Sequence, residues 1–486
     1  MTAHVLTALA DLDPALERAT EAARVLRASS NDTRARYLDA IADALDAAGE
    51  DLVPLAQQET NLAQARLTGE VARTTGQLRL LATAVREGSY LEAIIDHAAP
   101  EASPPRPDLR RLLIPLGPIV NFAASNFPFA FSVAGGDTAA ALAVGCPVIV
   151  KAHSGHRELS RRTADVVAAA LRAAGAPEGT FALAEGREVG TALVAHPRIA
   201  AGSFTGSVAG GRALFDIAAG RPDPIPFYGE LGSINPVVIT PGASAARAAE
   251  LGAGLAQSFT LGAGQFCTKP GIVFLPHGSA VPAAVVDALG QPVPAALLTP
   301  GIAESFADGW RTLADRGDVE VLTHAEAGPD GVTPGLVQVS LDTFRAHPEL
   351  QDELFGPATL LVGYEALADV VDTLAAMEGS LTATLHAEAD EDITALVEAA
   401  TERAGRVLFG GWPTGVAVNW SQQHGGPWPA TTSIFTSVGA TSLRRFQRPV
   451  AYQDAPDDIL PPALREDNPL GIPRRVDGRL HVEVPR

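Results

Sequence analysis

The sequence predicts an α/β protein with a mostly parallel sheet that helices cover on both faces. From residue 112 onward, short apolar runs of strand length alternate with segments of helical periodicity. This alternation is typical of strand–helix–strand units, whose parallel sheets are buried on both faces. About 47% of the 486 residues are hydrophobic, so the chain can bury sizeable cores, and its length allows two to four domains.

The chain is expected to begin with helices. Residues 14–50 and 66–95 place Ala, Leu and Ile at three-to-four spacing against charged residues. Asn31 or Asp32 is expected to cap the second helix. The segment 98–111 is rich in proline, which predicts an extended crossing segment or an edge strand.

The alternation that follows gives the order of the central elements. Strands are expected at 112–122, 146–152, 181–186, 199–207, 234–240 and 271–276. Helices are expected at 132–145, 157–174, 188–196, 210–220 and 243–259. Later apolar runs predict strands at 319–324, 335–340, 358–364, 381–387 and 404–410, with a last one in LHVEV (480–484).

Charge and residue usage exclude several classes of protein. The formal net charge of -20 and the absence of a Lys/Arg-rich block disfavour nucleic-acid binding. Lys151 and Lys269 are the only lysines, and neither stands in the Gly-Lys-Ser/Thr context of a phosphate-binding loop. We also expect no metal, because His153 and His156 lack a second ligand pair and the two cysteines form no CxxC motif.

The N-terminal region and the cysteine content indicate the compartment. The first residues carry Asp11 and Asp13 where the apolar part of a signal peptide would lie. The most apolar stretch, 119–150, is interrupted by Pro128 and by glycines, so no membrane span is expected. Two cysteines do not form a disulfide framework. A reducing, cytoplasmic setting is therefore predicted, without a membrane partner.

Cys267 is the first candidate for chemistry. It follows Gly262 and Gly264, which let the backbone approach a ligand closely, and Lys269 comes two positions later. This context predicts a nucleophilic thiol with a lowered pKa. The alternative is a buried structural cysteine, which is the interpretation that we favour for Cys146 inside its apolar strand.

Other polar residues follow predicted strands or glycine-rich turns. Glu230, flanked by glycines, is either a base that activates water or an exposed acid on a loop. Lys151 ends an apolar strand, where it either meets a phosphate or ribose or reaches solvent. Asn126 precedes Phe127-Pro128 and either donates to an oxyanion or stabilises a turn. His424 is followed by two glycines, which suggest a close approach, although most such histidines are structural or exposed.

One strand–turn–helix segment could also receive a pyrophosphate. FTGSVAGG (204–211) places Gly206 and Gly211 five residues apart, which departs from the usual dinucleotide pattern of glycines. The physical principle is the same, because amides at a helix N-terminus face the anion.

Together these segments resemble the aldehyde dehydrogenase superfamily from about residue 10 to the C-terminus. SNFPF, VIVKAH, FTGSVAGG, ELGSINP, GQFCTKPG and ELFGP occur in the family's order and spacing. The ending, with QHGGPWPATTS, RFQRPVAYQ and NPLGIPRRVDG, is similar to an NADP-preferring subgroup that includes 2-oxoglutarate semialdehyde (2,5-dioxopentanoate) and fatty aldehyde dehydrogenases.

The resemblance implies a fold of three parts. It would join a Rossmann-like cofactor domain (1–96 and 117–236), a catalytic domain (237–438), and an oligomerisation arm with the C-terminal segment (97–116 and 439–486). It also implies a homodimer or homotetramer.

The resemblance also implies the roles of particular residues. Cys267 would be the nucleophile, Asn126 an oxyanion donor and Glu230 the base for deacylation. The implied cofactor residues are Lys151 at the adenosine ribose, Gly206, Ser207 and Gly211 at the pyrophosphate, and Glu353 and Phe355 at the nicotinamide riboside.

Departures from the family pattern bear on the cofactor. Many NAD-preferring members have Glu where this chain has Ser154, so a 2′-phosphate would meet no repulsion there, and Arg187 is a plausible partner for it. NADP is therefore expected, with NAD as an alternative.

The expected reaction is oxidation of an aldehyde to a carboxylic acid through a cysteine thiohemiacetal and a thioester. The expected substrate is 2,5-dioxopentanoate. Three alternatives remain open: a fatty or other medium- or long-chain aldehyde as the substrate, a phosphorylating or CoA-acylating relative, and a non-catalytic NADP-binding relative.

Overall fold

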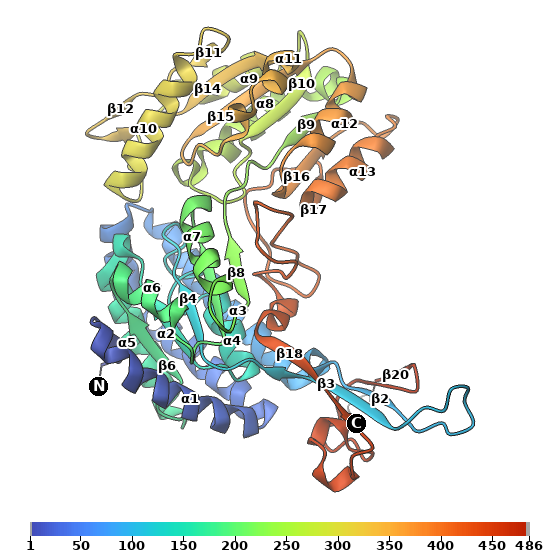
Figure 1. Cartoon of the computed structure of the whole chain (residues 1–486). Coiled ribbons are helices and arrows are strands. Elements are labelled where there is room, and N and C mark those ends of the chain that lie inside the picture. Colours follow the sequence, from blue (N-terminus) through green and yellow to red (C-terminus); the bar gives the residue numbers. More distant parts are fainter. Residues whose placement is uncertain (1, 483–486) are drawn as a thin grey trace.

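A computed structural model describes residues 2–482 of the chain. Figure 1 shows a lower α/β part from the N-terminal half, an upper α/β part, and an arm that projects to one side beside the C-terminal segment. Each of the three parts has its own sheet, so the α/β prediction is confirmed.

The lower part contains a sheet of six described strands, all parallel, in the order β1-β6-β5-β4-β7-β8. The strands are Val5–Leu6 (β1), Ile119–Phe122 (β4), Val148–Lys151 (β5), Phe181–Ala184 (β6), Ala201–Thr205 (β7) and Phe227–Glu230 (β8). From β4 the chain first adds β5 and β6 on one side and then β7 and β8 on the other. The carboxyl ends of β4 and β7 therefore border the switch point at which open α/β sheets bind ligands.

Seven helices of the described chain surround this sheet: Leu12–Ala28 (α1), Asn31–Thr60 (α2), Gln64–Glu87 (α3), Gly136–Val144 (α4), Arg157–Ala173 (α5), Arg187–Ala195 (α6) and Val208–Ala219 (α7). The cap of α2 is Ser30, whose hydroxyl accepts from the Thr33 amide, and the expected caps Asn31 and Asp32 lie inside the helix. Helix α3 ends before residue 95 because Gly88 adopts a left-handed φ of 86°.

The upper part contains a second sheet, in the order β11-β14-β15-β10-β9-β16-β17, in which β11 alone among the described strands is antiparallel. Its strands are Val237–Ile239 (β9), Ile272–Pro276 (β10), Glu320–Thr323 (β11), Gly335–Ser340 (β14), Ala358–Tyr364 (β15), Ser380–His386 (β16) and Ala404–Phe409 (β17). The helices are Pro241–Thr260 (α8), Val281–Leu289 (α9), Pro300–Ala314 (α10), Leu341–Ala346 (α11), Leu367–Ala376 (α12) and Thr394–Arg403 (α13). A small hairpin joins Ala327–Gly328 (β12) to Gly331–Val332 (β13).

The arm is a mixed sheet in the order β18-β3-β2-β19-β20. Its strands are Ile94–Asp96 (β2), Leu109–Pro115 (β3), Gln447–Gln453 (β18), Arg474–Val476 (β19) and Arg479–His481 (β20). The sheet thus begins with β2, before the boundary expected at residue 97. Of the last expected strand, the described residues place 480–481 in β20, while 483 and 484 lie outside them.

The expected strand 112–122 is instead two strands in two different sheets. Strand β3 belongs to the arm, and β4 belongs to the centre of the lower sheet. Gly117, with a φ of 134°, and Pro118 lie between them, so the ladder is broken and the chain changes direction. This turn joins the arm to the lower part.

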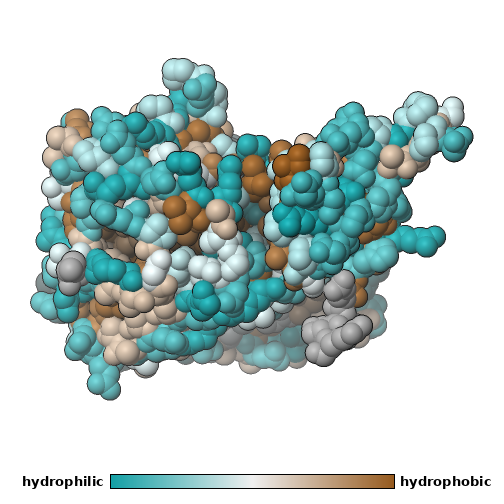
Figure 2. All heavy atoms as spheres, turned by 90° about the horizontal axis from the view of Figure 1, so that it is seen from below, coloured by the Kyte–Doolittle hydropathy of each residue, from teal (hydrophilic) through white to brown (hydrophobic). Residues whose placement is uncertain are grey.

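The outer surface is mostly polar on the face that can be seen in Figure 2. Apolar side chains lie there in separate small groups. Among residues 2–482, no helix combines the length and the apolar character needed to cross a membrane.

Candidate active site

Glu230 is the last residue of strand β8, which the sequence pattern did not predict. Glu230 was expected on a loop, but it lies in this strand. The alternative of an exposed acid is also wrong, because Glu230 is only 1% exposed. An isolated bridge pairs Glu230 with Thr431, and the Leu231 amide donates to Ala430. The segment after β17 therefore runs alongside β8, and it also carries His424.

Cys267 lies on the turn that leads from α8 to β10. Three consecutive residues before it, Gly262, Ala263 and Gly264, have left-handed backbone conformations. The close approach expected of Gly264 is not to a ligand, because a Cβ there would lie 2.1 Å from the Gly356 carbonyl oxygen. The side-chain amide of Asn235 holds the turn from the other side by donating to the carbonyls of Cys267 and Lys269.

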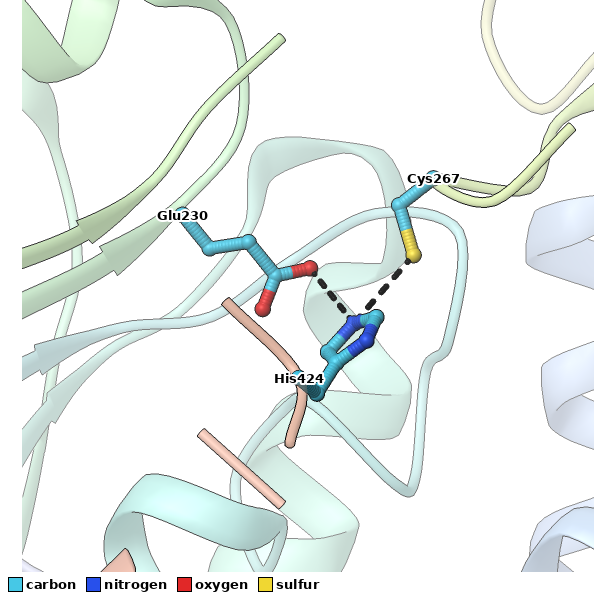
Figure 3. Close-up of side chains that lie close together, drawn as sticks. All are labelled: Glu230, Cys267 and His424. Atoms are coloured by element: carbon cyan, nitrogen blue, oxygen red, sulfur yellow. Dashed lines mark hydrogen bonds and ion pairs between the residues drawn. The ribbon is translucent and has the colours of Figure 1, made fainter. Parts of the chain in front are cut away.

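His424 brings these two predicted residues into one cluster (Figure 3). Its Nε2 lies 3.0 Å from Glu230 Oε1 and 3.6 Å from Cys267 Sγ. The Ser437 hydroxyl donates to the other oxygen of Glu230 at 2.7 Å. Sequence reasoning noted the Gly-Gly that follows His424 but did not assign the histidine to the site, and it missed Ser437 entirely.

The thiol and the carboxylate have opposite pKa shifts. Burial and the nearby charge of Glu230 raise the pKa of Cys267 well above its ordinary value. Burial also acts to raise the pKa of Glu230, but His424, Ser437 and Arg445 outweigh it, and the net pKa is lowered. The cluster at rest therefore pairs a protonated thiol with an ionised carboxylate, and the prediction of a lowered thiol pKa is wrong.

Lys269 does not lower the thiol pKa because its ammonium group points elsewhere. Its Nζ donates to the carbonyls of Leu354 at 2.8 Å and Ala358 at 2.7 Å. Burial lowers the pKa of Lys269 and raises that of Glu353, while each charge favours the other. The lysine thus ties the nucleophile turn to residues 353–358.

Asn126 lies on the loop that follows β4, close to the nucleophile turn. Its side-chain amide donates to the Gln265 carbonyl at 3.0 Å. A carboxamide has two N–H groups, so a second donor remains for an oxyanion. Helix α3 fixes this loop, because Arg66 donates to the Asn126 carbonyl and Glu70 accepts from the amides of Phe129 and Ala130.

A cavity of about 300 Å³ lies in front of Cys267. Its apolar wall is formed by Phe127, Phe131 and Phe266. Arg66 and Arg73 from α3 also line it, and the Nη1 atom of each is buried without a hydrogen-bond partner among residues 2–482. Sequence reasoning did not select these arginines, because only their seven-residue spacing on a predicted helix sets them apart.

The residues expected at the adenosine part of a cofactor lie along the carboxyl edge of the lower sheet. Lys151 ends β5 and is half-buried, while exposed Ser154 and Arg187 begin the turn after β5 and helix α6. Gly206 and Ser207 join β7 to α7.

The turn between β7 and α7 fits a pyrophosphate. The Ser207 hydroxyl caps α7 by accepting from the Gly210 amide. A Cβ on Gly211 would lie 2.0 Å from a methyl carbon of Leu231, so a larger residue here would displace the Leu231 side chain, and glycine lets the helix pack closely against the residue that follows β8. These features match a dinucleotide, whose pyrophosphate would face the N-terminus of the helix.

Glu353 and Phe355, expected at the nicotinamide riboside, lie on the segment before β15. A Cβ on Gly232 would lie 3.3 Å from Glu353 Oε2, so this carboxylate reaches the residues that follow Glu230. Phe355 packs against the core of the lower part. Both residues therefore lie where the upper part meets the lower part.

Comparisons with known proteins agree with this architecture. The chain is 47% identical over 485 residues to alpha-ketoglutaric semialdehyde dehydrogenase 2 of Azospirillum brasilense, covering 98% of this chain and 92% of that protein. It is 42% identical over 415 residues to alpha-ketoglutaric semialdehyde dehydrogenase of Acinetobacter baylyi, covering 83% and 79%.

A solved structure supports the fold alone. Aldehyde dehydrogenase 21 of Physcomitrella patens, crystallised with the reaction product succinate, has a TM-score of 0.77 at 18% identity, covering 91% of this chain and 90% of that one. Residues 4–428 match the aldehyde dehydrogenase family. By this match and by its identity to these relatives, the chain belongs to the aldehyde dehydrogenase family, whose members are oxidoreductases that use NAD(P).

Proposed function

We propose that this enzyme oxidises 2,5-dioxopentanoate (2-oxoglutarate semialdehyde) to 2-oxoglutarate, with NADP as the hydride acceptor. The main structural support for a substrate with a carboxylate is the pair of arginines in the cavity wall. Arg66 and Arg73 both line the cavity in front of Cys267, and each has a buried Nη1 without a hydrogen-bond partner among residues 2–482. Arginine is suited to a planar carboxylate, which can accept two of its N–H groups. The names of the Azospirillum and Acinetobacter relatives support the same substrate.

In the proposed mechanism, the thiol of Cys267 must lose its proton before it attacks the aldehyde carbon. His424 Nε2 lies beside both Sγ and the Glu230 carboxylate, so the proton can move onto this imidazole–carboxylate pair. The free amide N–H of Asn126 and the backbone N–H of Cys267 then donate to the oxyanion of the adduct. One such donor is typically worth about 2.7–4 kcal/mol.

When bound, NADP supplies the acceptor for hydride. The chain then holds a thioester on Cys267, which water must hydrolyse. Glu230 suits the role of base, because its lowered pKa keeps it ionised and Ser437 fixes its orientation. A base of this kind also favours hydrolysis over transfer to phosphate or CoA.

The competing proposals make different demands on the cavity. A long-chain aldehyde would use the wall of Phe127, Phe131 and Phe266, but it would leave the buried Nη1 of each arginine without a hydrogen-bond partner. A non-catalytic relative would have no need to bring Cys267, Glu230 and His424 together.

A test of the substrate uses Arg73→Met, because Arg73 is the arginine of the pair that does not hold the Asn126 loop. Hydrogen bonds to charged groups are worth about 1.5–3 kcal/mol, so kcat/KM for 2,5-dioxopentanoate should fall roughly 10- to 150-fold. Hexanal, which has no carboxylate, serves as the matched substrate and should change little. A loss of equal size for both aldehydes would contradict the assignment.

The cofactor proposal rests on Ser154 and is tested by Ser154→Glu. Glutamate would place a negative charge near a 2′-phosphate but would suit the free ribose hydroxyls of NAD. We expect the ratio of kcat/KM for NADP to that for NAD to fall at least about tenfold, since one like-charge contact costs on the order of 1–2 kcal/mol. Ser154→Gln, which has nearly the same size without the charge, is the control, and an unchanged ratio in Ser154→Glu would refute the role.

A further inference from the structure

The three residues of the catalytic cluster also form a set of metal ligands. Glu230, Cys267 and His424 each offer one ligand atom, and these atoms lie within 4.8 Å of one another. Within residues 2–482 this is the one group of three or more such side chains. Figure 3 shows the sulfur, the imidazole nitrogen and the carboxylate oxygen turned toward a common point.

The distances suit zinc. Zinc binds sulfur at about 2.3 Å and imidazole nitrogen at about 2.0–2.1 Å, so tetrahedral ligands of these two types stand about 3.6 Å apart. Cys267 Sγ and His424 Nε2 are 3.6 Å apart. The carboxylate oxygen lies 3.0 Å from the imidazole nitrogen, and all three ligand atoms lie within 4.8 Å of one another, so adjustment of the Glu230 side chain would complete the set.

Charge and access also favour a divalent cation. The thiolate and the carboxylate together carry two negative charges, which a Zn²⁺ ion balances. Ser437 holds the second oxygen of Glu230, which orients the carboxylate as outer hydrogen bonds do in zinc sites. Two of the three ligand residues, Cys267 and His424, line the cavity of about 300 Å³, which gives an ion a route to them.

We propose that Zn²⁺ binds to Cys267, His424 and Glu230 and reversibly inhibits the enzyme by occupying the nucleophile. Binding replaces the thiol hydrogen with the metal, and one proton passes to solvent for each ion bound. The thiolate is then committed to zinc and does not attack an aldehyde. The soft sulfur and the imidazole select zinc over Mg²⁺, which prefers oxygen ligands.

Binding is measured without an aldehyde, so the result does not depend on the proposed substrate. Zinc chloride is titrated into the full-length enzyme against a chromophoric chelator, and iodoacetamide labelling of Cys267 is followed by mass spectrometry. We expect one Zn²⁺ per chain, protection of Cys267 from labelling, reversal by EDTA, and no protection by magnesium chloride. Cys146→Ser, which alters the other cysteine outside the site, should bind zinc as the unaltered enzyme does.

Substitution of each ligand separates a shared site from binding by the thiol alone. Cys267→Ala, His424→Asn and Glu230→Gln should each weaken zinc binding at least about tenfold, since even outer-shell losses commonly cost 10- to 100-fold. Circular dichroism identifies any variant that fails to fold. The proposal is overturned if His424→Asn and Glu230→Gln both fold and bind zinc as tightly as the unaltered enzyme, or if the unaltered enzyme binds none.

Discussion

The charge of Glu230 disfavours ionisation of the Cys267 thiol, and His424 contacts both residues. Glu230 is buried and Cys267 is half-buried, and the ionised carboxylate makes the formation of a thiolate nearby unfavourable. The Nε2 atom of His424 lies 3.6 Å from the sulfur and 3.0 Å from the carboxylate, so this ring is the group through which the two communicate. The resting enzyme is therefore expected to hold a poorly reactive thiol, whose activation depends on the protonation of its neighbours.

This arrangement predicts how the reactivity of Cys267 changes with pH. Only the thiolate is alkylated, so the labelling rate rises as the pH passes upward through the thiol pKa. Glu230→Gln removes a charge that raises this pKa, and at each pH below the pKa Cys267 should therefore be labelled faster than in the unaltered enzyme. The measurement is the iodoacetamide labelling rate of Cys267 from pH 6 to pH 10.

Cys146 is the internal control in the same experiment. It is fully buried, and burial raises its pKa to about 11, so it should stay unlabelled over most of this range in both proteins. A labelling rate in Glu230→Gln that is unchanged or lower across this range would show that the carboxylate does not disfavour the thiolate.

The family resemblance, more than residue types alone, selected Cys267, Glu230 and Asn126 as candidates, and the sequence did not orient their neighbours. Lys269 is two positions from the nucleophile, yet its ammonium group turns to the carbonyls of residues 354 and 358. His424, 157 positions from Cys267, reaches the sulfur instead. Sequence spacing does not define the direction of a side chain on an irregular turn, and for that reason the pKa of the thiol was predicted with the wrong sign.

At the scale of elements, the nucleophile turn and the segment 353–358 behave as one unit. The Gly264 backbone packs against Gly356, and Lys269 spans the two segments with two hydrogen bonds. The segment also carries Glu353, which the family resemblance assigns to the nicotinamide ribose. A rigid connection would keep Glu353 at a fixed distance from the thiol of Cys267.

Lys269→Met tests this connection. The methionine leaves the carbonyls of Leu354 and Ala358 unpaired and removes the cation that favours an ionised Glu353. We expect the free energy of unfolding to fall by about 1–3 kcal/mol and the KM for NADP to rise about tenfold or more, with a smaller change in kcat. Steady-state kinetics and urea unfolding measure the two effects.

Thr268→Val is the matched substitution beside Lys269. The Thr268 hydroxyl is buried without a hydrogen-bond partner in the described part of the chain, so its loss breaks no such contact. If Lys269→Met and Thr268→Val alter the KM for NADP equally, the lysine does not position this segment.

Periodicity predicted most central strands and helices, but it failed where neighbouring elements belong to different sheets. The run 112–122 is continuous in its apolar character, and only Gly117 and Pro118 mark the change from the arm to the lower part. Strand β8 was missed because it has only four residues, Phe227–Glu230, and ends in a glycine and an acidic residue, which are uncommon in strands. Its identification required the pairing with β7.

At the scale of the whole molecule, the arm is the part whose surface is least accounted for by the single chain. It projects from the two α/β parts (Figure 1), and its edge strand β18 pairs only with β3 among the described strands. The side chains of Ile459 and Leu480, in the C-terminal segment, are 70% and 62% exposed. Unpaired strand edges and exposed apolar side chains commonly mark contacts with another chain.

The homodimer or homotetramer implied by the family resemblance can be tested on these residues. Light scattering of the unaltered enzyme should give two or four times the chain mass of 50.2 kDa. The double variant Ile459→Glu, Leu480→Glu should shift toward 50.2 kDa, because burying carboxylates in an apolar contact is unfavourable. Val293→Glu, at a site that is 84% exposed and remote from the arm in sequence, is the control and should leave the mass unchanged. If the unaltered enzyme has the mass of a single chain, the predicted assembly is wrong. If the double variant remains an oligomer, Ile459 and Leu480 do not form the contact between chains.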